Sequence, residues 1–317
     1  MSQFGVYGGE EFLKLELRKR DWLIENLIRE KDSAMLVGNE KSGKSLLIFQ
    51  LICSLTSQHP FIDKYEVMRP CNVSYIQLEG ELEDSQDRMK RMLKVLDFEP
   101  SRFQLLFLPP IAMEEGHVIK KLIKDLAPHK PDIIIIDPIY FALNGSLSDD
   151  LAVRRFIGNI RILKDNLECA VILVHHTHKM RMNTKGEVIN EGDDATFGSK
   201  FLKAYPDHTL LFVYDKNKCI RRLSCDTQRS GDIINATQLK LIEPDPLYFE
   251  EINQAPTKEA LLLSILMKNK DGLNIDELMI MMGVSRNTLY NSLKKPLADK
   301  VVIKTTGRPV RYTMKGK

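Results

Sequence analysis

One eight-residue string constrains the fold of this chain more than any other feature. It is GNEKSGKS, from Gly38 to Ser45, and it matches G-x-x-x-x-G-K-[ST] at every fixed position. An apolar run at 34–37 precedes the string, and an apolar helical pattern at 45–57 follows it. The two glycines let the backbone curl, so that several N–H groups and the positive end of the helix face one anion. The string therefore predicts a strand–loop–helix unit that binds phosphate groups.

The residues of this loop have separate expected roles. The Lys44 ammonium is expected to reach the β and γ phosphates, and the Ser45 hydroxyl to bind Mg²⁺. The alternative is an incidental glycine-rich turn, and the strand and helix around the loop argue against it. The sequence therefore predicts a nucleoside triphosphate site with ATP and Mg²⁺ as its ligands. The expected nucleotide-binding residues of the loop are Gly38, Asn39, Glu40, Lys41, Ser42, Gly43, Lys44, Ser45 and Leu46.

Short β-branched runs alternate with helical patterns from residue 33 to about residue 245. This alternation predicts an α/β fold, in which a mostly parallel sheet is covered by helices. Several runs are apolar throughout, as expected for strands that are covered on both faces. The expected strands are 34–37, 73–78, 103–108, 132–136, 170–174 and 209–214, with an edge meander at 219–225 and 238–242. The expected helices are 45–57, 83–96, 117–126 and 151–167.

The pattern changes beyond residue 243. Pro244, Pro246 and Pro256 surround a polar stretch that predicts a linker. Helical patterns then follow at 260–267, 275–282 and 286–298, and short β runs close the chain at 301–305 and 310–314. This order predicts a small C-terminal winged-helix domain. The expected organisation is a lead-in at 1–30, an α/β nucleotide-binding domain at 31–245, a linker at 246–256 and a winged helix at 257–317.

The composition is that of an ordinary globular protein. The 317 residues are 43% hydrophobic and 28% charged, which excludes wholesale disorder. Five scattered cysteines without a CxxC pair argue against a zinc site or a disulfide framework. No apolar run approaches the roughly 18 residues of a membrane-spanning helix, and charges occupy the N-terminus where a signal peptide would be apolar. We therefore expect a cytoplasmic protein with no membrane contact.

The net charge of +3 is unevenly distributed along the chain. Residues 257–317 hold twelve Lys and Arg against five Asp and Glu, a balance of +7, so residues 1–256 carry −4. A basic tail on a mildly acidic body predicts contact with a polyanion, of which nucleic acid is the commonest. A solvated, lysine-rich surface is the plainer alternative.

Two expected strand ends carry carboxylates suited to hydrolysis. Asp137 ends the run PDIIIID, and a carboxylate there helps to hold Mg²⁺ in a P-loop protein. Its alternative role is to cap the following turn. Glu79 follows another strand, and the carboxyl ends of parallel strands meet where the phosphates bind, so Glu79 can act as a general base for the attacking water. Glu81, Glu83 and Asp84 remain open alternatives, as does a solvated acidic helix start.

A histidine cluster follows the strand expected at 170–174. It reads HHTHK, and His175 and His176 are its first two residues. A neutral imidazole at this strand end can hydrogen-bond a γ-phosphate oxygen and so sense whether that phosphate is present. Zinc is the alternative ligand, but no cysteine or carboxylate stands at the spacing of a zinc site.

The ordered series of motifs resembles a known family. DWLIENLI, GNEKSGKS, YIQLEGE, PDIIIIDPIYFALNG, VILVHHTHK and FGSKFLKAYPD follow one another over about residues 12–232. This series resembles the RecA-like ATPases of the RepA hexameric helicase type, which are related to the DnaB-like replicative helicases. The resemblance implies a homo-oligomeric ring, usually a hexamer, with ATP between subunits and single-stranded DNA in the pore. It also implies that Glu79 is the catalytic base, Asp137 the magnesium carboxylate, and His175 with His176 the phosphate sensor.

The resemblance further implies a cation supplied by the neighbouring subunit, within an element similar to K-x-R-x-G. The matching stretch here is 226–231, in which Arg229 would serve as the arginine finger. Thr227 stands where the family has a lysine, so one cation is missing; Lys179 and Lys200 are candidates to replace it. A surface turn is the alternative role of Arg229.

DNA contacts are expected in two places, a loop at 178–197 and the C-terminal module. The loop also carries four acidic residues, so it is not strongly basic. Winged helices also bind proteins, which remains an alternative for the tail. The expected DNA contacts are Lys179, Arg181 and Lys185 in the loop, Arg286, Asn287 and Tyr290 on the recognition helix, and Lys304, Arg308 and Arg311 on the wing.

Three functions fit this sequence. The first is an ATP-driven DNA motor, a ring-forming replicative helicase of a plasmid, phage or similar element. The second is a RecA-like recombination ATPase that assembles on DNA without unwinding it. The third is a regulator in which the nucleotide switches oligomerisation and the winged helix binds an operator.

Overall fold

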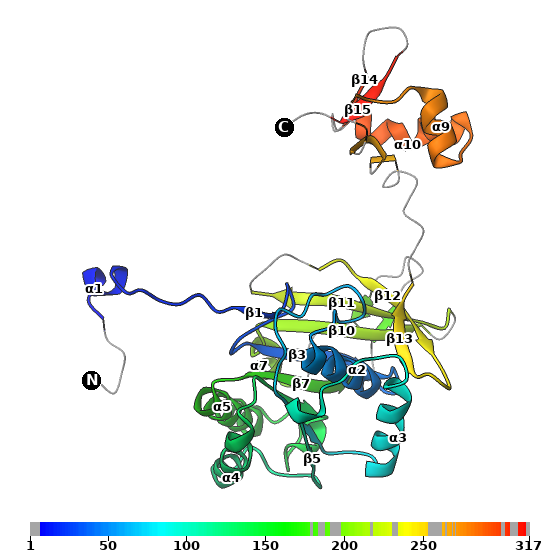
Figure 1. The fold of residues 1–317 in the computed structure, drawn as a ribbon. Helices are drawn as coiled ribbons and strands as arrows, with labels where there is room; N and C mark the ends of the chain where they lie inside the picture. The colour runs from blue at the N-terminus through cyan, green and yellow to red at the C-terminus, as the bar shows by residue number, and fades with distance from the viewer. Residues whose placement is uncertain are drawn as a thin grey trace. The chain divides into compact units, whose positions relative to one another are not determined.

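The computed structural model describes residues 7–177, 180–182, 188–190, 198–215, 218–229, 234–252, 262–263, 265–267, 269, 271–298, 302–304 and 310–314. The chain divides into two compact units, Met1–Ile252 and Asn253–Lys317. The first unit is built on a nine-stranded sheet (Figure 1). Its spatial order is β13-β12-β11-β10-β3-β7-β6-β4-β5. The strands are β3 (Ser33–Asn39), β4 (Val73–Gln77), β5 (Phe103–Phe107), β6 (Ile133–Asp137), β7 (Ala170–Thr177), β10 (His208–Asp215), β11 (Ile220–Gln228), β12 (Thr237–Ile242) and β13 (Tyr248–Glu251).

Six neighbouring strands of this sheet, from β10 to β5, run parallel, and β11, β12 and β13 extend it antiparallel. Helices cover both faces, because alternate residues of a strand point to opposite sides. Ala34 and Leu36 of β3 belong to the hydrophobic cluster under α2, whereas Met35 and Val37 belong to the cluster under α4 and α5. The predicted α/β fold with a mostly parallel sheet is confirmed. The helices are α1 (Gly9–Leu13), α2 (Lys44–Ser57), α3 (Leu82–Met92), α4 (Gly116–Leu126), α5 (Asp150–Leu167) and α7 (Lys200–Ala204).

Both predicted boundaries of the first domain need correction. At its C-terminal end, β13 pairs with β12 inside the stretch expected to be linker, and Leu247 and Phe249 are buried. Of the prolines that suggested a linker, Pro244 and Pro246 lie in the turn between these two strands, and Pro256 lies outside the described residues. At its N-terminal end, β1 (Trp22–Ile24) and β2 (Ile28–Arg29) form a small antiparallel sheet whose Leu23 joins the core under α2. The lead-in is therefore part of the folded unit from about β1 onward.

Smaller boundaries also differ from the prediction. The helix expected at 83–96 ends at Met92, and the strand expected at 219–225 continues to Gln228. The loop expected at 178–197 contains two paired short strands, β8 (Met180–Met182) and β9 (Val188–Asn190).

The second unit packs around its own apolar cluster, which includes Leu266, Leu278, Leu289 and Tyr312. Its described elements are α9 (Ile275–Met282), α10 (Arg286–Ala298), and the antiparallel pair β14 (Val302–Lys304) and β15 (Tyr312–Met314). Asn274 caps α9, since its Oδ1 accepts from the Glu277 N–H at 2.9 Å. This order of helix, turn, helix and hairpin follows the predicted order, and the helix expected at 260–267 lies partly outside the described residues.

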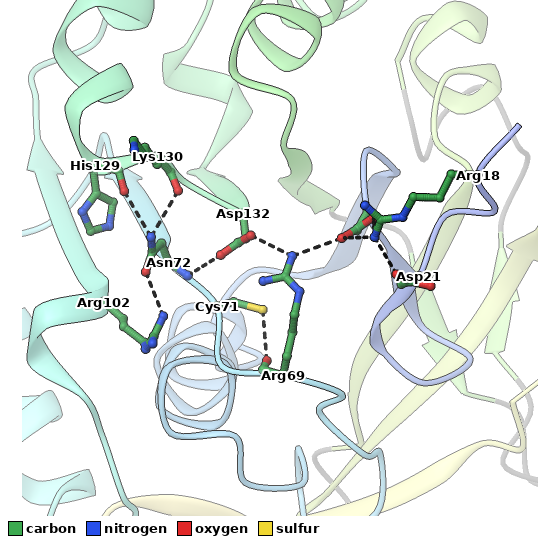
Figure 2. Close-up of polar contacts among 10 residues, drawn as sticks. Arg18, Asp21, Arg69, Cys71, Asn72, Arg102, His129, Lys130 and Asp132 are labelled. Carbon is green, nitrogen blue, oxygen red and sulfur yellow. Dashed lines mark hydrogen bonds and ion pairs between the residues drawn. The ribbon is translucent and has the colours of Figure 1, made fainter.

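The amino-terminal end of the parallel sheet is held by a network of ion pairs and hydrogen bonds (Figure 2). Asp132, just before β6, accepts from Arg69 Nη2 at 2.8 Å and from the Asn72 N–H at 2.7 Å. Arg69 also pairs with Glu30, which Arg18 contacts from the N-terminal segment. Asp132 therefore anchors loops at the end of β6 that lies away from Asp137.

A second carboxylate at this end, Asp32, is fully buried. Its Oδ2 lies 2.9 Å from His208 Nε2 and accepts from the Arg29 N–H at 2.9 Å, and its Oδ1 accepts from Arg20 Nη1 at 2.6 Å. Burial alone would raise the pKa of Asp32, but His208, the Arg29 amide and Arg20 together hold this pKa below its ordinary value. The ionised carboxylate is therefore stabilised by folding.

Replacing Asp32 with Asn should lower the free energy of unfolding at pH 7 by about 2 kcal/mol, because buried groups lose a charged hydrogen-bond partner. A carboxyl whose pKa is depressed by folding adds stability above its unfolded pKa, and this stability is lost as the pH falls through the folded pKa. The gap between wild type and Asp32→Asn should therefore narrow below about pH 4. Urea titrations followed by circular dichroism at pH 7, 5, 4 and 3 measure this gap. A gap that stays constant down to pH 3 contradicts the assignment.

Candidate nucleotide site

The phosphate-binding loop joins β3 to α2 and requires glycine at two positions. A Cβ on Gly38 would lie 2.0 Å from the carbonyl oxygen of Phe212 in β10, so the two backbones are too close for any side chain. Gly43 caps α2 with a φ of +95°, and a Cβ there would also come within 3.0 Å of Phe249 Cζ. The loop is therefore held tightly against β10 and β13.

Lys44 is the first residue of α2 and is only 3% exposed. Its Nζ donates to the carbonyl oxygens of Gly38 and Asn39, each at 2.7 Å. Burial lowers the pKa of Lys44 to about 8, against the opposing effect of Asp137, Glu40 and Glu79. A bound polyanion would stabilise the charged form of the Lys44 amine and so offset the effect of burial. The position of this lysine therefore suits phosphate binding.

Asp137 ends β6 and is buried beside Lys44 and Ser45. Its Oδ2 accepts from the Tyr75 hydroxyl at 2.8 Å, while its Oδ1 is buried without a hydrogen-bond partner in the described part of the chain. Burial raises the pKa of Asp137, and the hydroxyls of Ser45 and Tyr75 act against that rise. An orphaned carboxylate oxygen beside a serine hydroxyl is a donor set that suits Mg²⁺, which prefers oxygen ligands.

Glu79 stands two residues beyond β4 and lines the same cavity as Lys44 and Asp137. Gln77 holds this strand end, since its Nε2 donates to the Glu79 carbonyl and to Ser85 Oγ, both at 2.8 Å. Glu81 instead forms the N-cap position of α3, and Glu83 and Asp84 lie exposed in its first turn. Of the four candidate carboxylates, the geometry brings Glu79 into the cavity.

The cavity has a volume of about 360 Å³ and opens beside the phosphate-binding loop. His176 lines it, as predicted for a phosphate sensor, whereas His175 is buried outside its lining. Two lining residues escaped the sequence analysis, Tyr75 on β4 and Arg88 on α3. Helical spacing could have indicated Arg88, since it lies three residues after Ser85 on the same face. The predicted loop residues in this lining are Lys41, Gly43, Lys44, Ser45 and Leu46.

Arg229, the predicted arginine finger, lies at the end of the sheet opposite the phosphate-binding loop of its own chain. Gln228 pairs with His208 at the start of β10, and β10 runs parallel to β3, so the start of the loop at Gly38 lies about 13 Å away by strand rise. Arg229 Nη2 donates to the Ala204 carbonyl at 2.8 Å and Nη1 pairs with Asp207 at 3.5 Å. A finger that acts on the neighbouring subunit's nucleotide is not expected beside the loop of its own chain, so this role of Arg229 stays a prediction.

Arg221, near the start of β11, is a further cation that lies beside the loop. Its Nε donates to the Ser42 carbonyl oxygen at 3.4 Å. Lys218, in the preceding turn, is exposed and lies 4.0 Å from Asp215.

The predicted DNA contacts are only partly described. Lys179, Lys185 and Arg308 lie outside the described residues, and Arg181 and Lys304 are described in their backbone alone. On α10, Arg286 and Asn287 are exposed and Tyr290 is 45% exposed; Arg286 pairs with Asp276 at 2.7 Å. Arg311 Nη1 donates to the Gly272 carbonyl at 2.7 Å, so this side chain also stabilises the fold of the second unit.

The parallel sheet, the loop and its carboxylates define the class of the first unit, a RecA-like P-loop ATPase fold. The chain belongs to the AAA_25 family, described as AAA domain, which matches residues 9–182. Among solved structures, the KaiC-like protein PH0186 from the hyperthermophilic archaeon Pyrococcus horikoshii OT3 is similar, with a TM-score of 0.52 and 12% identity over 72% of this chain and 93% of that chain. The solved ATPase domain of another protein has a TM-score of 0.49 and 10% identity over 67% of this chain and 82% of that chain. No curated protein sequence matches the chain.

No helix in the described part of the chain is long and apolar enough to cross a lipid bilayer. No group of three or more His, Cys, Asp or Glu side chains in it is arranged to hold a metal ion. Any Mg²⁺ held by Asp137 and Ser45 therefore needs the nucleotide's oxygens and water as its remaining ligands.

Replacing Lys44 with Ala should weaken ATP binding by about a hundredfold or more, since losing one partner of a desolvated charge pair costs about 2–5 kcal/mol. The fold should survive, because the amine contacts only loop carbonyls. Fluorescence titration with a labelled ATP analogue measures the affinity, and circular dichroism checks the fold. Lys90→Ala, which removes an exposed lysine from α3, is the control. Affinity equal to wild type in a folded Lys44→Ala protein would refute the phosphate site.

Proposed function

We propose that this chain is an ATP-dependent DNA motor, a ring-forming replicative helicase of a mobile element that acts on single-stranded DNA. The observation that carries the proposal is the gathering of Lys44, Asp137 and Glu79 around one cavity at the carboxyl end of the parallel strands. The family and the fold support an ATPase. The DNA-motor part rests on the resemblance of the ordered motifs and on the basic tail.

The chain's own residues can divide the work of hydrolysis among them. The loop N–H groups and Lys44 bind and orient the phosphates. Glu79 accepts a proton from the attacking water as general base, and His176 hydrogen-bonds a phosphate oxygen. Ser45 and Asp137 would hold Mg²⁺, which when bound neutralises charge on the phosphates. Arg88 on α3 lines the same cavity, so its guanidinium is placed to bind the nucleotide as well.

The ring is proposed to be a homo-oligomer, usually of six subunits, with ATP between neighbours and the DNA strand in the pore. Arg229 lies far from the loop of its own chain, so any role as a finger requires the nucleotide of another subunit. The second unit is proposed to be a winged helix that binds duplex or junction DNA. Its exposed Arg286 and Asn287 at the start of α10 support this role.

A strand-displacement assay on tailed duplexes separates this function from its alternatives. A motor unwinds the duplex in an ATP-dependent and directional manner. A recombination ATPase that only assembles on DNA does not unwind it, and a nucleotide-switched regulator binds one duplex sequence with negligible turnover. Unwinding with ATP, and none with a non-hydrolysable analogue, is the expected result.

Glu79→Gln should keep ATP binding and lower turnover by about a hundredfold or more, in line with general-base contributions. The matched control is Glu81→Gln, which changes the same side chain two residues away at the N-cap of α3. Steady-state phosphate release and nucleotide titration measure the two effects. If Glu81→Gln loses turnover and Glu79→Gln does not, the assignment of the base is wrong.

The double substitution Arg286→Ala with Arg308→Ala should weaken duplex binding and leave basal ATP turnover unchanged. Each lost phosphate contact removes about 0.9 from the slope of log affinity against log salt, so the slope should flatten by nearly two. Binding isotherms from about 50 to about 300 mM salt measure the slope, at roughly the ionic strengths where screening matters. Lys90→Ala with Lys121→Ala removes the same charge from the first unit as a control. An unchanged slope would indicate that the tail binds protein.

A further inference from the structure

The last hairpin of the sheet contacts both helices that begin at the nucleotide cavity. This hairpin comprises β12, the turn at 243–247 and β13, and its outer strand β13 stands at the edge of the sheet (Figure 1). The first contact is to α2. Gln50, which is 3% exposed, donates from Nε2 to the Phe249 carbonyl at 2.8 Å and accepts at Oε1 from the Phe249 N–H at 2.7 Å. The amide of Gln50 therefore pairs with β13 as the backbone of another strand would.

The Phe249 ring extends this contact to the phosphate-binding loop itself. It stands where a Cβ on Gly43 would come within 3.0 Å, and it packs edge-on against Phe212 at 5.4 Å between ring centroids. The Arg221 guanidinium lies 5.6 Å from the Phe249 ring and 4.2 Å from the Tyr214 ring. Because Arg221 also donates to the Ser42 carbonyl, this stack touches the loop at two neighbouring residues.

The hairpin also contacts α3 and the turn after it. Arg91 Nε in α3 donates to the Pro244 carbonyl at 2.7 Å, and Lys94, two residues beyond the helix, pairs with Asp245. The helix α3 begins three residues after Glu79 and carries Arg88 on the cavity. The hairpin thus joins the helix of the loop to the helix that follows the proposed base.

We propose that the β12–β13 hairpin is a positioning element of the nucleotide site, acting through Gln50, Phe249 and Arg221 on the backbone of the phosphate-binding loop. These residues touch the loop and its helix, whereas Asp137 ends β6 and Glu79 stands two residues beyond β4. Loosening the hairpin therefore weakens nucleotide binding and leaves the rate of the bound complex nearly intact. This inference rests on the proposed ATPase function.

Three substitutions in the full chain test the hairpin. Gln50→Met removes both hydrogen bonds at nearly constant volume, Phe249→Leu removes the ring, and Arg221→Met removes the guanidinium. Each should raise the KM for ATP and the dissociation constant of a labelled ATP analogue by about tenfold, as for the loss of one net hydrogen bond or ring contact, with kcat within about twofold of wild type. Arg221→Lys keeps the charge and should restore part of the loss.

Glu250→Gln is the matched control, since Glu250 is an exposed neighbour of Phe249 on the same strand. Melting curves with and without the analogue accompany the kinetics. If the Gln50→Met protein does not fold, the test uses Phe249→Leu and Arg221→Met. Both of these replace the side chain with a large apolar one, so we expect both proteins to fold. A KM and an affinity equal to wild type overturn the inference, whatever the melting temperature, and so does a kcat that falls while the affinity stays unchanged.

The two possible failures are distinguishable. If the wild-type chain itself binds no ATP analogue, the proposed function is wrong. If the wild type binds and the hairpin variants bind equally well, only the positioning role is wrong.

Discussion

The close approach of backbones around the phosphate-binding loop is the constraint on which the rest of this structure depends. Gly38 lies against the Phe212 carbonyl with no room for a side chain, and Gly43 has a positive φ and lies against the Phe249 ring. This packing buries Lys44 under the loop, where its amine binds two carbonyls. Desolvation then lowers its pKa to about 8, so an anionic ligand completes the environment of the lysine.

The parallel arrangement of the sheet explains why the other functional groups meet at the same place. β4, β6 and β7 end beside the loop, and they bring Glu79, Asp137 and His176 to one cavity. The opposite end of the sheet uses its carboxylates differently. Asp32 and Asp132 bind arginines, a histidine and backbone amides there, so they hold the strands and loops together. The carboxyl ends of the parallel strands therefore carry the proposed hydrolytic groups, and the opposite end carries the carboxylates that stabilise the fold.

Sequence patterns predicted the parallel core and its loop because both depend on local signals, namely apolar strands, helical spacing and a fixed glycine motif. They also predicted where Glu79 and Asp137 lie, because the carboxyl ends of parallel strands meet at one edge of the sheet. They failed where distant pairing decides the outcome. Phe249 lay in a proline-marked stretch, and its burial depends on Gln50, 199 residues earlier in the chain.

ATP hydrolysis measured with and without single-stranded DNA tests the account most directly, because it joins the cavity to the proposed DNA partner. The account predicts measurable turnover by the full chain, stimulated several-fold by single-stranded DNA and abolished by loss of the Lys44 amine. Turnover that is indifferent to DNA would contradict the motor and leave an ATPase of another kind. An absence of both turnover and nucleotide binding would contradict the nucleotide site itself.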